Sequence, residues 1–427
     1  MKIGMVTACY KPVINGVTQM VLLYKKQLEA LGHEVYIFTL GEPDPAGEDE
    51  NVIRSPAMAV GSEGYYAAMR YTTAAQKLLG QMDIIHCHHL FMSVDLAHRY
   101  GRCPIVYTNH TRYDLYTGNF IPIAQQTGDA IMRQVWPEYT DLADVVITPS
   151  ASVRDVMLSF GVRRPIEVIE NGVDLRPFIN PSAPKTKTEL GIPETAVLLI
   201  YVGRLAVEKN METLLRQTAV AHDIAPDIHL AIIGDGRARV DLEKLAVELD
   251  MDSYTHFLGA IPYDELSNYL AAADLFATAS VTEVHPLTII EAMAAGLPIA
   301  ATASPGIKDT VDAGVTGFLA ADPATGLAAA IVGLATNPAR LREMAMAAQE
   351  ASTRFDINHT VEHTLELYGR LRQERPDLVR VREHGRWLRN SERLEPLVEQ
   401  LARLVRPYSI VEKWLGLTPR NGIGAGK

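Results

Sequence analysis

The feature that most constrains the fold is an alternation of short apolar runs with longer stretches of helical period, and it occurs twice. In the first half, runs rich in Val, Ile and Thr flank helical stretches such as 16–33; the runs cover 2–8, 34–40, 83–89, 105–110 and 144–150. The second half repeats the pattern around helical stretches at 211–223 and 287–296; its runs cover 196–203, 229–236, 275–280, 297–302 and 317–321. Such spacing indicates βαβ units and parallel sheets. We expect an α/β fold of two doubly wound domains, which bind ligands at the carboxyl ends of their strands.

A proline-rich, polar segment separates the two halves. Residues 176–192 read RPFINPSAPKTKTELGI and show no apolar period, as expected of a connection between domains. A chain of 427 residues is long enough for two or three domains of about 150 residues each. We therefore expect a first domain over residues 1–180 and a second over 187–358, followed by a last segment over 359–427.

The charge of the chain is uneven, and this limits the partners that it suits. The net charge of −11 argues against general nucleic-acid binding. Residues 375–427 hold 11 Lys and Arg against 6 Asp and Glu, whereas the rest of the chain is net −16. A basic tail on an acidic body fits electrostatic attachment to an anionic membrane surface. A helical tail that packs on its own protein fits the same residues, and both interpretations stay open.

Three sequence features bear on the cellular compartment. The cysteines, Cys9, Cys87 and Cys103, lack CxxC spacing and cannot all pair, which favours buried thiols in a reducing compartment. The N-terminal MKIGMVTACY is typical of a buried strand rather than a signal peptide, and no apolar run reaches the ~18 residues of a membrane helix. We expect a cytoplasmic protein, located at the inner face of the membrane if its tail binds lipid. The sequence does not predict an oligomeric state.

Two glutamates eight residues apart give the most informative pattern for a binding site. Glu283 follows the run at 275–280, and Glu291 lies about one turn into the helical stretch 287–296. Both can therefore reach one ligand at the carboxyl edge of the second sheet. Ionised carboxylates accept the paired hydroxyl donors of a ribose or hexose. Taken alone, the pair is better explained by Glu291 as an exposed helix residue and Glu283 as a partner of the helix dipole.

Two cations follow another buried run of the second half. Arg204 and Lys209 come directly after the run at 196–203, at the entrance to a helix, and Gly203 lets the backbone approach a ligand there. Helix N-termini favour anions, so the pair suits a diphosphate, whose charge it could neutralise without a metal. In the first half, Gly16 opens a helix after the first run and is a second candidate phosphate site.

Histidines gather where two runs of the first half end. His86, His88 and His89 close one apolar run, and His110 closes another. Residues at strand ends of a doubly wound sheet are candidates for a cleft. Successive side chains on a strand point to opposite faces, so HxHH does not direct three ligands to one metal. We expect no metal site, and packing or capping roles for at least two of these histidines.

At these residues the sequence resembles the large family of retaining, E-x7-E-containing glycosyltransferases of the GT-B fold. The resemblance spans roughly residues 1–370, and its elements follow one another in the expected order. They are Gly16 after the first run, D-I-I-H-x-H at 83–88, NGVD at 171–174, GRL-x3-KN at 203–210, GDG at 234–236 and E-x7-E-AMA-x-G-x-P at 283–298. Their joint occurrence is far more specific than any one of them.

The resemblance implies the architecture and the chemistry. A GT-B fold has two Rossmann-like domains facing across a cleft, so residues 1–180 would bind the acceptor and 187–358 the nucleotide sugar. Within 359–427, a helix would cross back to the first domain ahead of the basic tail. Family members retain the anomeric configuration, and the donor phosphate can deprotonate the acceptor. The resemblance thus implies no protein nucleophile, no metal and no cofactor besides the nucleotide-sugar co-substrate.

Carried over position by position, the resemblance gives roles to the residues named above. Arg204 and Lys209, with Gly203 beside them, would hold the donor diphosphate. The loop at Gly16 would approach that diphosphate from the first domain. Glu291 would accept hydrogen bonds from the nucleotide ribose.

The same resemblance names two residues at the catalytic centre. Glu283 would contact sugar hydroxyls near the transferred carbon, and His110 would reach the sugar from the first domain. The residues that follow Glu283 would complete the donor site; they are His285, Pro286 and Leu287.

The chain departs from the family pattern at two places. Many relatives read E-G-F-P where this chain reads Glu283-Val284-His285-Pro286. Valine lacks the freedom of glycine at φ > 0, so we expect backbone contacts to the donor sugar to differ. Asp309 stands where a glutamate is common, and the sequence assigns it no role.

Within the family, two stretches look most like the branch that glucosylates diacylglycerol. They are TNHTRYDLYTG at 108–118 and TEVHPLT at 282–288. This likeness implies UDP-glucose as donor and a membrane lipid as acceptor. Small soluble acceptors such as inositol phosphates, malate or sugar phosphates stay open, as does a nucleotide-sugar-binding module without activity. A dehydrogenase would need GxGxxG after the first strand, and residues 8–19 do not supply those glycines.

Overall fold

A parallel seven-stranded sheet organises the first half of the computed structural model, which describes residues 1–374 except 48, 61–64, 69 and 116–124. Its strand order is β3-β2-β1-β6-β7-β8-β9. The strands are β1 (Lys2–Val6), β2 (Glu34–Leu40), β3 (Val52–Ser55), β6 (Ile84–Cys87), β7 (Ile105–Thr108), β8 (Val145–Thr148) and β9 (Ile166–Val168), and an antiparallel pair is formed by β4 (Met58–Val60) and β5 (Tyr65–Ala67). The helices are α1 (Gly16–Ala30), α2 (Thr73–Leu79), the turn η1 (Leu90–Val94), α3 (Asp95–Tyr100), α5 (Gln125–Thr140) and α6 (Ala151–Ser159).

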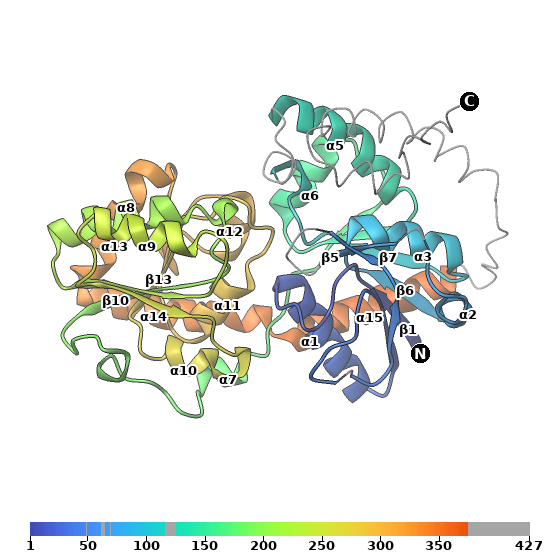
Figure 1. Cartoon of the computed structure of the whole chain (residues 1–427), viewed down its shortest axis with the longest axis horizontal. Coiled ribbons are helices and arrows are strands. Elements are labelled where there is room, and N and C mark those ends of the chain that lie inside the picture. The colour runs from blue at the N-terminus through green and yellow to red at the C-terminus, as the bar shows by residue number, and fades with distance from the viewer. Residues whose placement is uncertain (48, 61–64, 69, 116–124, 375–427) are drawn as a thin grey trace, which may run out of the picture.

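A second parallel sheet of six strands organises the other half (Figure 1). Its order is β12-β11-β10-β13-β14-β15. The strands are β10 (Val197–Val202), β11 (Ile228–Ile233), β12 (Thr255–Gly259), β13 (Leu275–Thr278), β14 (Ile299–Thr302) and β15 (Gly317–Ala320). The helices are α8 (Met211–Ile224), α9 (Arg239–Glu248), α10 (Leu266–Leu270), α11 (Leu287–Ala294), α12 (Pro305–Thr310), α13 (Pro323–Ala335) and α14 (Pro338–Ser352), with short turns η3 (Val207–Lys209) and η4 (Tyr263–Glu265).

The expected α/β architecture of two doubly wound domains is confirmed. Each of the ten apolar runs in the sequence contains a strand of one of these sheets. The sequence pattern missed three edge strands, β3, β9 and β12, whose residues are mostly half-buried. An edge strand is covered less than an inner one, so it needs no continuous apolar run.

In each sheet the strand order reverses between two neighbouring strands. β1 lies between β2 and β6, and β10 lies between β11 and β13. At such a switch point the loops leaving neighbouring strands turn to opposite faces and open a crevice at the carboxyl edge. The loops after β1, β6, β10 and β13 are therefore where a ligand site is expected.

The proline-rich segment expected to connect the domains packs on the second domain. Its helix α7 (Arg176–Ile179) buries Phe178, whose ring meets Tyr263 edge to face at 6.2 Å between centroids. Farther along, the backbone N–H of Ala183 donates to Asn268 Oδ1 at 2.8 Å. Proline-rich, polar composition indicated an irregular backbone, but it did not reveal that this backbone docks on a domain.

The chain crosses between the two sheets twice, and the crossings lie side by side. The backbone N–H of Val173 donates to Phe355 O at 2.9 Å, and that of Ile357 donates to Val173 O at 3.0 Å. A Cβ at Gly172 would lie 2.5 Å from the Ile357 Cα, so this close packing requires glycine. Backbone hydrogen bonds thus join the two crossings to each other.

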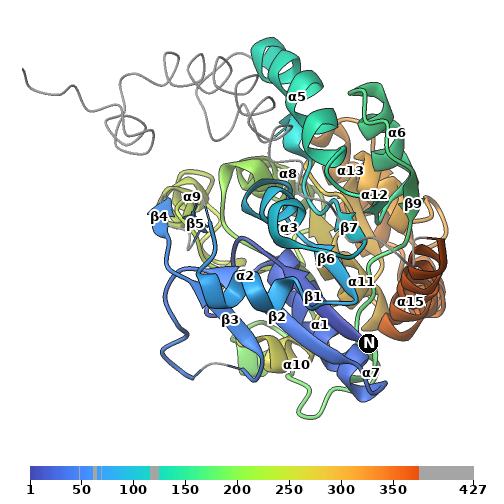
Figure 2. The same cartoon turned by 90° about the vertical axis from the view of Figure 1, so that its right-hand side faces the viewer.

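After the second crossing, α15 (Ile357–Glu374) returns to the first domain, as the resemblance implied. The helix runs beside α1 and the first sheet (Figures 1 and 2). The hydroxyls of Tyr24 and Thr364 are 3.1 Å apart, and His86 Nδ1 lies 2.6 Å from the Tyr368 hydroxyl. All four side chains are buried, so α15 completes the core of the first domain.

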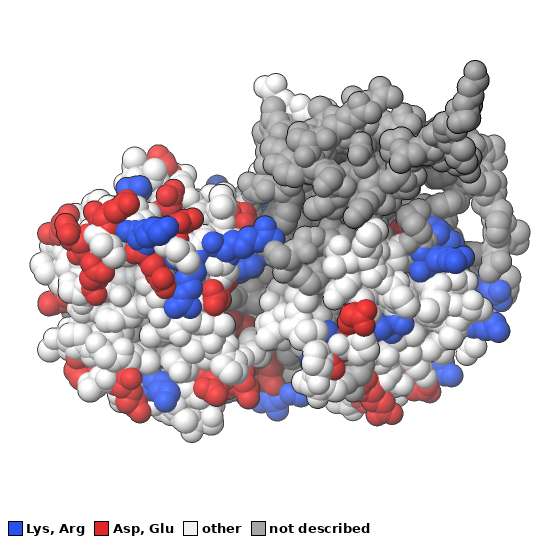
Figure 3. Space-filling model, in the orientation of Figure 1, with Lys and Arg blue, Asp and Glu red and all other residues white. Residues whose placement is uncertain are grey.

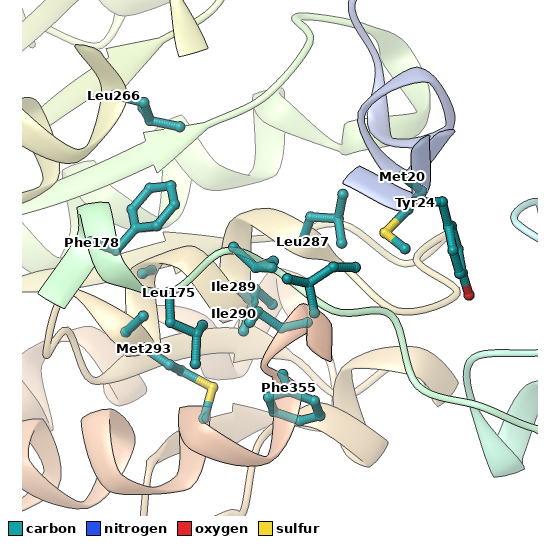
Figure 4. Close-up of a cluster of buried hydrophobic side chains, with 14 of the residues drawn as sticks. Met20, Tyr24, Leu175, Phe178, Leu266, Leu287, Ile289, Ile290, Met293 and Phe355 are labelled. Atoms are coloured by element: carbon teal, nitrogen blue, oxygen red, sulfur yellow. The ribbon is translucent and has the colours of Figure 1, made fainter. Parts of the chain in front are cut away.

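An apolar cluster joins the domains beside these crossings. Met20 and Tyr24 of α1 approach Leu287 at the start of α11, and Ile290 continues the cluster into the second domain (Figure 4). Val284, which stands where many relatives have glycine, packs into a cluster made otherwise of first-domain side chains. Burial of these side chains between the domains favours a closed arrangement.

A carboxylate of the second domain caps a helix of the first. Asp309 accepts hydrogen bonds from the backbone N–H and hydroxyl of Ser152, at 2.8 and 2.7 Å, and from the hydroxyl of Ser150, the N-cap of α6. Burial opposes ionisation of Asp309, but these hydrogen bonds hold its pKa below the ordinary value. Since α6 leaves β8 and α12 leaves β14, this contact shows that the carboxyl edges of the two sheets face each other.

The Asp309→Ala variant should populate more open arrangements of the two domains. A charge-assisted hydrogen bond contributes about 1.5–3 kcal/mol, which shifts a two-state balance by about 10- to 150-fold. Small-angle scattering measures the change as a larger radius of gyration, with Asp312→Ala, an exposed carboxylate nearby, as the control. Scattering curves that superimpose on the wild type would show that other contacts set the arrangement.

Candidate active site

The loops after β10 and β13 meet through an ion pair at the switch point of the second sheet. Lys209 Nζ lies 2.7 Å from Glu283 Oε1, and the hydroxyl of Ser280 donates to the same oxygen at 2.7 Å. Burial opposes ionisation of Glu283, but Lys209, Ser280 and the nearby Arg204 together hold its pKa below the ordinary value. Glu283 is therefore a carboxylate at neutral pH, held in place by two donors.

The second cation sits at the other end of the same loop. Arg204 Nη2 lies 2.5 Å from Glu208 Oε1, and its side chain stays about one third exposed. Gly203, which precedes it, has a φ of +157°, and a Cβ there would lie 2.7 Å from the Tyr201 hydroxyl oxygen, so a side chain at this position would be strained. Figure 3 shows basic side chains on this domain reaching toward the first domain among acidic ones. Arg204 and Lys209 thus lie in one short loop, as expected.

Glu291 lies on α11, the helix that follows β13, and is almost fully buried. Its Oε1 accepts a hydrogen bond from the Tyr263 hydroxyl at 2.8 Å. Burial raises the pKa of Glu291 to about 7, against a smaller lowering by that hydrogen bond. A buried carboxyl that titrates near neutral pH is typical of a binding or catalytic site rather than of an exposed helix surface.

The three residues expected to complete the donor site point their side chains into the protein. The His285 ring is buried edge to face against Phe355, with centroids 5.1 Å apart, and burial lowers its pKa to about 3. Leu287 belongs to the apolar cluster between the domains, and Pro286 is the N-cap residue of α11. A nucleotide-sugar donor would therefore contact this segment mainly through its backbone atoms.

Gly16 begins α1 at the switch point of the first sheet. Asn15 caps the helix by accepting from the backbone N–H groups of Val17 and Thr18, at 2.9 and 3.0 Å. A Cβ at Gly16 would meet no atom within 4 Å, so the backbone here faces open space. The start of α1 therefore leaves room for a ligand, and its role as a phosphate site stays a prediction.

The four histidines of the first sheet form a connected group. His86 contacts Thr108 Oγ1 through Nε2 at 2.5 Å, and His89 Nδ1 accepts from the backbone N–H of Ala8 at 3.2 Å. His88 Nδ1 lies 3.1 Å from His110 Nε2, with the two rings stacked. Burial lowers the pKa of His86 and of His110 to about 3 and that of His89 to about 4, so all three are neutral at pH 7.

Across the part of the chain that the structure describes, no group of three or more His, Cys, Asp or Glu side chains is arranged to hold a metal ion. The three cysteines are buried free thiols. No helix among the described residues is long and apolar enough to span a membrane. Residues 375–427 lie outside the described part, so the structure tests neither interpretation of the basic tail.

Three residues outside the predicted site support it, and of these only Asn171 belongs to an element of the family pattern. Tyr263 holds Glu291, and Ser280 holds Glu283. Asn171, the first residue of the NGVD element, donates from Nδ2 to the His285 carbonyl at 3.0 Å and so fixes the loop after Glu283. Ser280 directly follows β13, so its position at a strand end could have marked it as a candidate. Tyr263 lies in the separate turn η4, and only the folded structure brings it to Glu291.

Two doubly wound domains whose carboxyl edges face each other, with paired cations and carboxylates at one switch point, define the class of GT-B glycosyltransferases. Sequence comparison agrees. The profile described as Glycosyl transferases group 1 matches residues 182–351, and the profile described as Glycosyltransferase Family 4 matches residues 14–176.

Individual relatives support the same assignment. The α-monoglucosyldiacylglycerol synthase of Acholeplasma laidlawii is 31% identical over 318 residues, covering 70% of this chain and 79% of that protein. The D-inositol 3-phosphate glycosyltransferase of Corynebacterium kroppenstedtii is 28% identical, covering 80% and 82%. Among solved structures, HepE of Anabaena in complex with UDP and glucose has a TM-score of 0.69 at 22% identity, covering 87% of this chain and all of that one.

The chain belongs to the group 1 glycosyltransferase family and has the GT-B fold. It is an enzyme, a hexosyltransferase that moves a sugar from a nucleotide sugar. The sequence predicted this family and fold, and both are confirmed.

Glu291→Gln should stabilise the folded protein at alkaline pH while weakening nucleotide binding. The pKa of Glu291 is 4.5 ordinarily and about 7 when folded. The folded state therefore holds a proton that the unfolded state has lost between these values, and stability falls as pH rises through this window, by up to about 3 kcal/mol. Gln carries no such penalty, so the Tm of the variant should rise relative to the wild type between pH 5 and pH 8.

Calorimetry at the two pH values measures the stability effect, and titration with UDP measures binding. We expect UDP affinity to fall by about 10- to 150-fold, as for loss of a charge-assisted contact. Glu212→Gln, at an exposed position of α8, is the control for the substitution. A Tm difference that does not change with pH would contradict the buried, neutral-pH titration of Glu291.

Proposed function

We propose that this enzyme is a retaining transferase that moves glucose from UDP-glucose to a hydroxyl of diacylglycerol. The observation that carries the donor half is the Lys209–Glu283 pair at the switch point, with Arg204 in the same loop and Glu291 buried behind it. Cations and carboxylates within one crevice suit a ligand with an anionic diphosphate at one end and hydroxyls at the other.

The proposed reaction follows from where these charges lie. Arg204 and Lys209 would stabilise the charge that develops on the departing diphosphate, which is the step that an electrostatic site accelerates most. The bond from the sugar C1 to the diphosphate oxygen breaks, the acceptor oxygen bonds to C1 from the same face, and the acceptor proton passes to a phosphate oxygen. Glu283 would bind the sugar hydroxyls. This scheme requires no metal and no protein nucleophile.

His110 would act in this scheme as a neutral hydrogen-bonding group. Its pKa of about 3 leaves no imidazolium at neutral pH, so it would orient the sugar rather than supply a proton. The Gly16 backbone at the start of α1 would approach the diphosphate from the same domain. The two carboxyl edges carry different parts of the site. The domains must therefore close to bring the first-domain part, with His110 and Gly16, against the donor-binding part of the second domain.

A lipid acceptor is supported by two observations. The relative from Acholeplasma laidlawii is a diacylglycerol glucosyltransferase by name, and it is 31% identical over 70% of this chain. The basic tail 375–427 contains Trp387, Trp414, Arg403 and Arg406, residue types that suit an anionic lipid interface. On this proposal the enzyme is a peripheral protein of the cytoplasmic membrane face.

A soluble acceptor is the second candidate. The match to a D-inositol 3-phosphate glycosyltransferase, over 80% of this chain, favours a phosphorylated polyol. The first domain would bind this acceptor in the same crevice. The two candidates differ in the acceptor alone and share every donor contact.

Incubation with a panel of nucleotide sugars should give a product with UDP-glucose and diacylglycerol vesicles. Mass spectrometry identifies the product, and the proton coupling at C1 reports an α linkage if configuration is retained. Excess EDTA should leave the rate nearly unchanged, because the two cations replace a metal. Rates should be higher on anionic than on neutral vesicles and should fall with salt. Transfer to inositol phosphate without vesicles would favour the soluble acceptor, and a rate restored only by Mg²⁺ would contradict metal independence.

Glu283→Gln and His110→Ala should each reduce turnover by about 10- to 150-fold, because each removes a positioned contact to the sugar. The Tm of both variants should stay within a few degrees of the wild type. Glu212→Gln serves again as the control and should turn over normally. Variants that unfold, or that react at the wild-type rate, would assign these residues to the fold instead of the donor.

A further inference from the structure

His88 has no role in the scheme above, yet its ring is the direct neighbour of His110. It follows β6, is 1% exposed, and places Nδ1 3.1 Å from His110 Nε2. The planes of the two rings differ by 13°. The second nitrogen of His88, Nε2, is buried and has no hydrogen-bond partner among the described residues.

The contact couples the protons of the two rings. Burial lowers the pKa of His88 well below its ordinary value, and that of His110 to about 3, so each neutral ring carries one proton. A hydrogen bond between two neutral imidazoles needs one N–H and one lone pair. If His88 Nδ1 donates, His110 must carry its proton on Nδ1; if His110 Nε2 donates, His88 must carry its proton on Nε2.

The orphaned nitrogen of His88 decides between these two arrangements. When His110 donates, His88 buries an N–H at Nε2 without an acceptor. When His88 donates, only a lone pair is left unpaired at that position. Unpaired buried N–H groups are rarer in proteins than under-used acceptors, so donation by His88 is favoured. His110 then accepts at Nε2 and carries its proton on Nδ1.

We propose that His88 is a positioning residue that fixes His110 in the Nδ1–H tautomer, so that His110 presents a hydrogen-bond donor to the sugar. The inference rests on the proposed role of His110 at the donor. His110 needs such a partner to stay in one tautomer, because an isolated neutral imidazole exchanges its proton between both nitrogens.

The surroundings of His88 keep it from turning away. Its ring lies 4.2 Å from that of His86 and 5.9 Å from that of Tyr24, centroid to centroid. His86 is itself held from both sides, by Thr108 and by Tyr368 of α15. His88 is therefore packed against His86, and His110, which follows the neighbouring strand β7, is its one hydrogen-bonded ring among the described histidines.

The first test reads the tautomer directly. Nitrogen NMR of the protein labelled with ¹⁵N-histidine distinguishes a protonated from an unprotonated ring nitrogen, and His110→Asn assigns the His110 signals. We expect the wild-type His110 to carry its proton on Nδ1 at pH 7. The His88→Phe variant keeps the ring shape and removes the donor, so His110 should shift toward an Nε2–H or mixed state. A wild-type His110 protonated on Nε2 would overturn the inference whatever the activity.

The second test uses turnover with UDP-glucose and the acceptor found in the panel. His88→Phe should lower kcat by at least 10-fold with less than a threefold change in the KM for the donor. His88→Asn places an amide N–H near the position of Nδ1 and should recover most of this loss. His222→Phe, at a stacked histidine of the second domain, is the control for the substitution.

The double variant separates this inference from the proposed function. If His88 acts only through His110, His88→Phe combined with His110→Ala should be no slower than His110→Ala alone. Wild-type kcat in His88→Phe, with His110→Ala strongly impaired, would overturn the role of His88 and leave that of His110 standing. Normal turnover in His110→Ala would overturn the proposed role of His110 itself, while the NMR result would still report on the pairing.

Discussion

Parallel pairing of β1 with β6 and of β10 with β13 is the constraint on which the site depends. Where strand order reverses, the loops that leave two neighbouring strands diverge, and the edge between them stays open. The two domains each supply one such edge, and the Asp309 contact to Ser150 and Ser152 shows that these edges are opposed. The cations and carboxylates of the second domain and the histidines of the first thereby stand at the carboxyl edges of their own sheets.

The charged side chains of the site reduce the stability of the folded protein. Lys209 and Glu283 offset each other's charge through direct contact, and about one fifth of each side chain stays exposed, so water can still solvate either charge alone. Glu291 has only the Tyr263 hydroxyl beside it, and its pKa is raised as a result. Stability is thus lower near neutral pH than an uncharged side chain would allow, which is typical of positions kept for binding.

Sequence patterns predicted the inner strands, the helices that follow them, and the glutamates, cations and His110 as site candidates. The strands could be predicted because a strand buried on both faces is a continuous apolar run. The site candidates could be named because they stand at fixed offsets from strand ends, and their roles stay predictions. The residues that hold the site residues in place could not be predicted in the same way. Tyr263 and Asn171 reach their partners across 28 and 114 residues of chain, and a single sequence holds no period that records such a contact. The buried side chain of His285 was also not foreseen, because position in a loop does not say which way a ring turns.

The return of α15 to the first domain has a consequence for how the protein is made. A ribosome completes residues 1–180 long before it reaches Thr364 and Tyr368, which cover Tyr24 and His86. While the second domain is being synthesised, part of the core of the first domain is therefore still uncovered, and His86 lacks its contact with Tyr368. Its final packing is a late event that depends on the C-terminal end of the described chain. Each domain has its own sheet, but the first domain cannot complete its core until α15 has been synthesised.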